Sequence, residues 1–116
     1  MKVLILGGEG MLGHKVFQIL SPRFDTCVTF QQAGGAWTRY PVYKEIEPKR
    51  LLAGVNALNF ESVIRAFAGA RPDVVINCIG IIKQLKEAKD PVVSIQLNAL
   101  FPHRLADLCA ATGTRL

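Results

Sequence analysis

The sequence has few of the features that mark secreted or metal-binding proteins. Its 116 residues contain three cysteines, Cys27, Cys78 and Cys109, with no Cys-x-x-Cys pair, and two histidines that complete no metal-ligand spacing. An odd number of widely spaced cysteines is typical of reduced thiols in the cytoplasm. We therefore expect a cytoplasmic protein in which Cys27 and Cys78 are small core residues.

Long apolar runs are also absent. No run reaches the roughly 18 residues that a membrane-spanning helix needs, and the apolar N-terminal stretch is too short for a signal peptide and ends in glycines. Because 50% of the residues are hydrophobic, the chain should still fold around one core. We expect a single domain over residues 1–116 and no membrane partner.

Positive charge is present but not concentrated. The formal net charge is +5 at pH 7, and the basic residues are scattered from Lys2 to Arg115 without interleaved aromatic residues. This pattern argues against nucleic acid as a partner. It suits a smaller polyanion such as a nucleotide.

What the sequence does have is a spaced set of glycines directly after the apolar residues 3–6, namely Gly7, Gly10 and Gly13. A strand, a glycine turn and a helix in this order form the entry of a dinucleotide-binding βαβ unit. Gly7 allows a tight turn, Gly10 lets a pyrophosphate approach the backbone, and Gly13 lets the helix pack closely. The helix then directs free N–H groups at the phosphates. The alternative is a glycine-rich turn without a ligand.

Hydrophobic periodicity predicts strands at residues 2–6, 26–30, 51–55 and 73–78. It predicts helices at residues 11–20, 60–70 and 91–111, of which the first should bury Leu12, Val16, Ile19 and Leu20. Asn59 and Asp90 are the expected N-caps of the last two helices, and Pro102 should kink or split the third.

Strands that alternate with helices indicate an α/β fold with a parallel sheet, and Rossmann winding orders it 3-2-1-4. Residues 115–116 look like the first step of a fifth strand. The fourth strand is apolar in the manner of a strand buried on both faces, so it should not lie at a sheet edge. We therefore expect a truncated Rossmann fold of about four strands, incomplete at its C-terminus.

Residues 31–47 are the least regular part of the sequence. They contain Trp37, Tyr40 and Tyr43, with Arg39 and Lys44 nearby. One interpretation is a surface loop that its aromatic side chains anchor. The other places part of this loop beside the adenosine end of a cofactor.

Three segments together resemble the extended short-chain dehydrogenase/reductase superfamily. They are the glycine motif, residues 71–80 (Arg-Pro-Asp-Val-Val-Ile-Asn-Cys-Ile-Gly), and the Asp90-Pro91 helix with Asn98 and Leu100. Within it, the chain is most similar to the dTDP-4-dehydrorhamnose reductase-like group of nucleotide-sugar reductases and epimerases. The resemblance covers nearly all of this chain but only the N-terminal half of such an enzyme. It implies the NAD(P)-binding half of a nucleotide-sugar oxidoreductase, whose sugar substrate binds only to the full-length protein.

The resemblance assigns the pyrophosphate to the three glycines, with the backbone N–H groups of Met11 and Leu12 at the start of the helix. Asn56 stands where relatives commonly have an Asp that contacts the adenine amino group. An amide oxygen can accept the same hydrogen bond.

The segment after the fourth strand, Cys78, Ile79 and Gly80, matches the residues that lie along the adenine and ribose. Asn98 matches a buried Asn that ties the next helix to the fourth strand, and its apolar neighbours favour burial; the alternative is a solvated helix residue.

The end of the second strand departs from the family pattern. NAD-preferring enzymes place an Asp or Glu there for the ribose 2′-hydroxyl, whereas this sequence has Gln31 and Gln32. The missing acid favours NADP over NAD as the cofactor. No basic residue follows the strand directly, but Arg39 could reach in from the loop.

No catalytic residue is assigned within this chain. Family catalysis uses a Ser or Thr after the fifth strand and a Tyr-x-x-x-Lys pair on the next helix, and the sequence contains no such pair. Lys83, in the loop after the fourth strand, is interpreted as a solvated loop lysine; the alternative is a lysine that faces the substrate side. The alternative function is a non-catalytic dinucleotide-binding or interaction module that forms a homo-oligomer through its exposed sheet edge.

Overall fold

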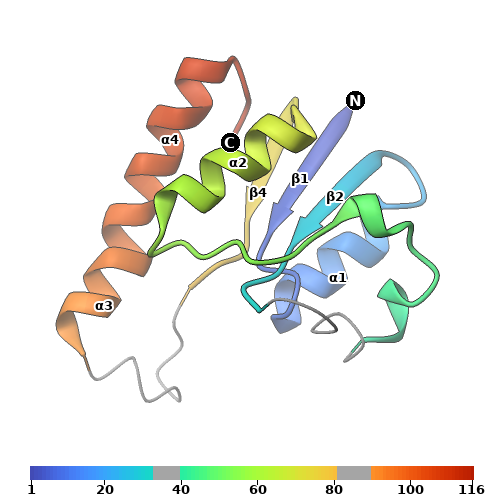
Figure 1. The fold of residues 1–116 in the computed structure, drawn as a ribbon, viewed down its shortest axis with the longest axis horizontal. Helices are drawn as coiled ribbons and strands as arrows, with labels where there is room; N and C mark the ends of the chain where they lie inside the picture. Colours follow the sequence, from blue (N-terminus) through green and yellow to red (C-terminus); the bar gives the residue numbers. More distant parts are fainter. Residues whose placement is uncertain (33–39, 81–89) are drawn as a thin grey trace.

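The computed structural model describes residues 1–32, 40–80 and 90–116. Within them four strands form one parallel sheet in the order β3-β2-β1-β4 (Figure 1). The strands are β1 (Lys2–Leu6), β2 (Asp25–Thr29), β3 (Leu51–Leu52) and β4 (Val74–Asn77). The predicted α/β fold and its strand order are confirmed.

Helices cover both faces of the sheet. Helix α1 (Met11–Leu20) lies on one face, and α2 (Phe60–Ala70) and α4 (Phe101–Thr112) lie on the other (Figure 1). Alternate residues of β1 therefore serve two cores: Val3 and Ile5 pack with the α1 side, and Leu4 and Leu6 with the α2 and α4 side. The carboxyl ends of all strands meet at one edge of this three-layer unit.

The buried face of α1 differs from the predicted one. Helix α1 buries Gly13 and Phe17, whereas Leu12 and Ile19 are 64% and 67% exposed. The reason is that Gly13 packs against the glycine turn, which fixes the rotation of the helix. Phe17, four residues later, then lies on the same face and enters the core.

Strand β3 is shorter than the predicted residues 51–55. Gly54 has φ +73°, a left-handed conformation that ends the extended backbone. Val55 then returns to β2, because its N–H donates to the carbonyl of Phe30 at 2.9 Å. The chain thus crosses the carboxyl edge of the sheet directly after β3.

The N-terminus of α2 is organised differently from the prediction. Asn59 precedes the helix as expected, but its side chain caps no N–H group. Instead the hydroxyl of Ser62 accepts a hydrogen bond from the N–H of Asn56 at 2.9 Å and donates one to the carbonyl of Asn59 at 2.6 Å. Ser62 therefore fixes the turn that carries Asn56.

The last predicted helix consists of α3 (Pro91–Ile95), a π-helical segment Gln96–Leu100 and α4. Asp90 caps it as predicted, accepting the N–H of Val92 at 3.0 Å. Pro102 lies in the first turn of α4 and has no N–H to donate. The wider π-helical turn before it accommodates the proline, so the helical backbone continues from residue 91 to 112 and the predicted split does not occur.

Arg115 pairs with the outer edge of β4. Its N–H donates to Asp73 at 2.9 Å, its carbonyl accepts the N–H of Val75 at 2.8 Å, and it forms a parallel bridge with Val74. This is the predicted first step of a fifth strand.

Candidate functional site

The turn after β1 is tied closely to β2. Gly7 has φ +90°, and its N–H donates to the hydroxyl of Thr29 at 3.2 Å. The N–H of Gly8 donates to the carbonyl of Thr29 at 2.7 Å, and the N–H of Gly10 to the carbonyl of Gly7 at 3.3 Å. The positive φ of Gly7 explains why a glycine is needed at the point where the chain leaves the strand.

The glycines of this turn have different reasons to lack a side chain. A Cβ on Gly13 would overlap the carbonyl oxygen of Gly7, and one on Gly8 would overlap the side chain of Val28. A Cβ on Gly10 would meet only the carbonyl of Gly7, at an ordinary 3.7 Å. The fold thus requires Gly8 and Gly13, while packing leaves the position of Gly10 open, as a close ligand approach needs.

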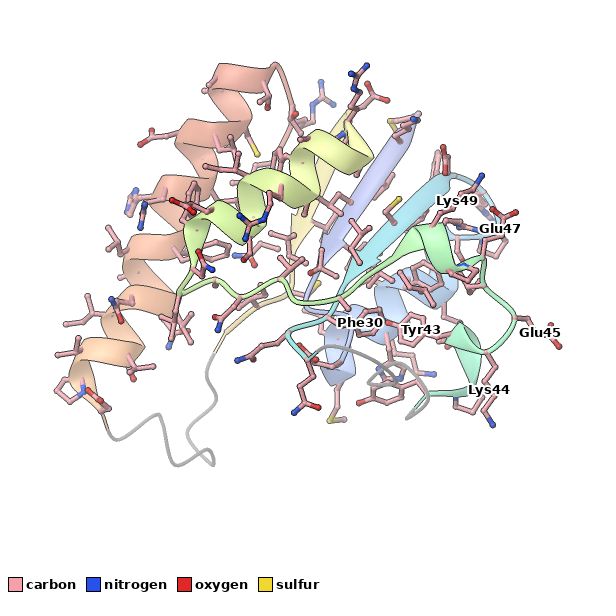
Figure 2. All side chains as sticks on the ribbon, in the orientation of Figure 1. Phe30, Tyr43, Lys44, Glu45, Glu47 and Lys49 are labelled. Carbon is pink, nitrogen blue, oxygen red and sulfur yellow. The ribbon has the colours of Figure 1, made fainter. Side chains whose placement is uncertain are left out.

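Aromatic residues of the loop after β2 contact the glycine turn and help to hold it in place. Tyr43 is 1% exposed, and its hydroxyl donates to the carbonyl of Gly8 at 2.7 Å. Figure 2 shows it beside Phe30, with the ring centroids 5.0 Å apart. The Tyr40 ring stacks on the His14 ring with centroids 3.9 Å apart, and the Tyr40 hydroxyl donates to the carbonyl of Glu9 at 3.2 Å. The predicted anchoring by Tyr40 and Tyr43 is confirmed, and Trp37 lies outside the described residues.

A pocket of about 430 Å³ opens at the carboxyl ends of the strands, within the range of roughly 300–1,000 Å³ usual for ligand sites. It brings together seven of the predicted cofactor residues: Gly7, Gly10, Gln31, Asn56, Cys78, Ile79 and Gly80. Segments far apart in the sequence meet here because parallel strands end at the same edge.

Four predicted cofactor residues are not part of this pocket. Met11 and Leu12 are 82% and 64% exposed, and Gly13 is buried behind the turn. Arg39 lies outside the described residues. The role of the Met11 and Leu12 backbone N–H groups therefore stays a prediction.

Seven pocket residues were not predicted from the sequence: Glu9, Thr29, Val55, Ala57, Leu58, Val93 and Leu97. Thr29 carried a usable signal, because it ends a predicted strand and ligands lie beyond such ends. Val93 and Leu97 carried none, since they reach the pocket only through the packing of the last helix.

Asn56 combines a structural and a potential binding role. Its Oδ1 accepts the N–H of Leu58 at 2.9 Å, which closes an Asx turn at the pocket wall. A carbonyl oxygen has two lone pairs, so one remains for a ligand donor.

Cys78 presents a neutral thiol to the pocket. All three cysteines are free, and burial raises the pKa of the Cys78 thiol above its ordinary value. A protonated thiol places no negative charge beside an anionic ligand. Cys109 is buried, whereas Cys27 and Cys78 are only half-buried, so the predicted core role of the latter two is met in part.

Asn98 is exposed, and the predicted burial is wrong. The π-helical segment that carries it has no buried residue. Its Oδ1 nevertheless lies 3.4 Å from the position of a Cβ on Gly80, so it borders the end of β4.

The start of α1 suits an anion. Gly10 caps the helix without a side chain, and no acidic residue lies in its first turn. Its first N–H groups therefore point outward unshielded, at the positive end of the helix dipole. Across the described parts of the chain we find neither a cluster of metal-binding side chains nor a helix with the length and apolar character to span a bilayer.

Among solved structures, the chain is similar to the UDP-glucose 4-epimerase of Thermus thermophilus in complex with NAD, with 28% identity and a TM-score of 0.74. The match covers 98% of this chain and 35% of that one. The dTDP-4-dehydrorhamnose reductase of Clostridium acetobutylicum shares 24% identity at a TM-score of 0.62, over 98% of this chain and 34% of that one. WbmG of Bordetella bronchiseptica, in complex with NAD, shares 21% identity at a TM-score of 0.75, over 98% of this chain and 35% of that one. At 24% and 21% identity, the last two structures support the fold alone.

The chain thus spans about 35% of the length of these proteins. No curated protein matches it. The family model of the RmlD substrate binding domain matches residues 1–116. The resemblance to the dTDP-4-dehydrorhamnose reductase-like group predicted this match, and the chain belongs to the RmlD substrate binding domain family.

Proposed function

We propose that this chain binds NAD or NADP, with the pyrophosphate over Gly10 and the first N–H groups of α1. The observation that carries the proposal is the open position at Gly10 within a turn whose other glycines are required for packing. That position lines the pocket and precedes a helix N-terminus without an acid. Oriented N–H groups and the helix dipole stabilise a pyrophosphate there.

The adenosine half would extend along the rest of the pocket. Asn56 and Ile79 line it from the two sides of the glycine turn, on the segments after β3 and β4. The remaining lone pair of the Asn56 oxygen can accept the adenine amino group, and Ile79 offers an apolar surface for the ring.

In a longer protein, we propose that this unit serves a nucleotide-sugar reductase or epimerase located in the cytoplasm. The family match and the likeness to the Thermus epimerase support the nucleotide-sugar function. The chain would supply the cofactor site, and the sugar-binding and catalytic groups would lie outside these residues. The dinucleotide would then carry the hydride while this chain positions it.

Isothermal titration calorimetry of the folded chain with NAD and NADP tests the proposal. We expect saturable binding of at least one dinucleotide and a raised melting temperature, because a ligand that binds only the native state stabilises it. A folded chain that shows neither heat nor a thermal shift at millimolar dinucleotide contradicts the proposal.

A second candidate is self-association at the outer edge of β4. Arg115 pairs with this edge only at its first residues, and in the described ranges nothing pairs with the backbone of Asn77 on that side. An unpaired edge is a template for a strand of another copy. Sedimentation equilibrium over a wide concentration range tests this, and a monomer throughout would exclude it.

A further inference from the structure

Glu9 belongs to the glycine turn, yet its side chain reaches the segment after β2. Its Oε1 accepts a hydrogen bond from the backbone N–H of Gln31 at 2.8 Å, and both residues line the pocket. The backbone of Glu9 is held as well, because its carbonyl accepts the Tyr40 hydroxyl at 3.2 Å. The carboxylate is therefore fixed at the carboxyl end of β2.

Within the described residues, no ion pair involves this carboxylate. Over residues 1–32, 40–80 and 90–116 the ion pairs join Lys49 to Glu47 and Arg65 to Glu61, and neither involves Glu9. One oxygen accepts the Gln31 N–H, which leaves the second oxygen as an acceptor toward the pocket.

We propose, resting on the proposed function, that Glu9 selects NAD over NADP. In dinucleotide sites a carboxylate at the end of the second strand accepts a hydrogen bond from the ribose 2′-hydroxyl. Here the strand is followed by Phe30, Gln31 and Gln32, and the glycine turn supplies the carboxylate instead. The premise for expecting NADP, the lack of an acid at this place, is thereby removed.

The charge of Glu9 acts mainly against the wrong cofactor. NADP carries a phosphate where NAD carries the 2′-hydroxyl, so a nearby carboxylate loses a donor and meets like charge. Gln31 offers an uncharged amide and no cation to offset the repulsion. The discrimination therefore depends on the charge of Glu9 rather than on its shape.

The test compares the wild-type chain with Glu9→Gln by calorimetry with NAD and NADP, and with the fragments 5′-AMP and adenosine 2′,5′-bisphosphate. The Gln side chain keeps an acceptor oxygen for the Gln31 N–H, so the turn is preserved. Glu45→Gln is the control, because it removes the same charge at an exposed residue that Figure 2 shows projecting away from the molecule.

We expect the wild type to bind NAD about tenfold or more tightly than NADP, and Glu9→Gln to reduce that ratio by about tenfold, as repulsion near a protein surface predicts. Glu45→Gln should leave the ratio unchanged. Raising the salt concentration should lower the ratio of NAD affinity to NADP affinity more in the wild type than in Glu9→Gln, because salt screens the repulsion.

Wild-type binding of NADP at least as tight as that of NAD would overturn the proposal, as would an unchanged ratio in Glu9→Gln. If neither dinucleotide binds the folded wild type, the proposed function itself fails, which is a separate outcome.

Discussion

The hydroxyl of Tyr43 donates a 2.7 Å hydrogen bond to the carbonyl oxygen of Gly8, 35 residues earlier in the chain. The Tyr43 ring also packs against Phe17 of α1 and against Phe30, with ring centroids 5.1 Å and 5.0 Å apart. One side chain thus joins the glycine turn, α1 and the segment after β2. The loop after β2 is therefore part of the support of the pocket and not merely a connection.

Tyr43→Phe should lower the free energy of unfolding by about 1–3 kcal/mol, because it leaves the carbonyl of Gly8 without its buried donor. Urea denaturation measures this change. Tyr40→Phe is the matched control, since its bond to the carbonyl of Glu9 is longer and only half-buried. An equal or larger loss in Tyr40→Phe would contradict the structural weight given to Tyr43.

Stability should fall as pH rises above about 9. Burial raises the pKa of the Cys78 and Cys109 thiols above their ordinary 9.0, and that of the Tyr43 phenol above its ordinary 10.0. The unfolded chain therefore releases these protons first and binds fewer of them than the native state, so unfolding becomes easier as pH rises.

Denaturation of the reduced chain at pH 7, 9 and 10.5 checks this dependence. The Tyr43 contribution is isolated by Tyr43→Phe, whose deficit relative to the wild type should shrink above pH 10. A deficit that stays constant or grows with pH would show that the phenol is not held protonated by the fold.

Substitutions of glycine should separate ligand binding from folding. Gly13→Ala places a methyl group on the carbonyl of Gly7 and should destabilise the chain by roughly 1–3 kcal/mol or more. Gly10→Ala should change stability by less than about 1 kcal/mol, since Gly10 has φ −87° and space for a Cβ. It should weaken dinucleotide binding by about tenfold, because the methyl group stands at the phosphate approach.

Gly69→Ala is the control for these substitutions, because a Cβ there meets nothing within 4 Å. It lies in α2, away from the pocket, and should leave binding unchanged. Unaltered dinucleotide affinity in Gly10→Ala would show that the pyrophosphate does not approach this turn.

Local patterns in the sequence predicted the strands and the glycine turn, because hydrophobic periodicity and glycine spacing are properties of short segments. The strand order followed from the general winding rule for alternating strands and helices. The Glu9 to Gln31 contact could not be predicted, since it joins residues 22 apart that meet only when β1 and β2 are paired. The requirement for Gly8 likewise depends on Val28 in the neighbouring strand. The predicted burial of Asn98 failed for a similar reason. Its exposure follows from how the π-helical segment packs, which the sequence does not encode locally.

Asn56 should tolerate Asp better than Ala. Asp keeps an oxygen for the Leu58 N–H and a second acceptor for the adenine amino group, so NAD affinity should stay within about threefold. Ala removes both hydrogen bonds and should weaken binding by roughly fivefold and stability by about 1 kcal/mol. Calorimetry and urea denaturation measure the two effects, with Asn59→Ala as the control because the Asn59 side chain caps nothing. If Asn59→Ala weakens binding as much as Asn56→Ala, the adenine contact does not belong to Asn56.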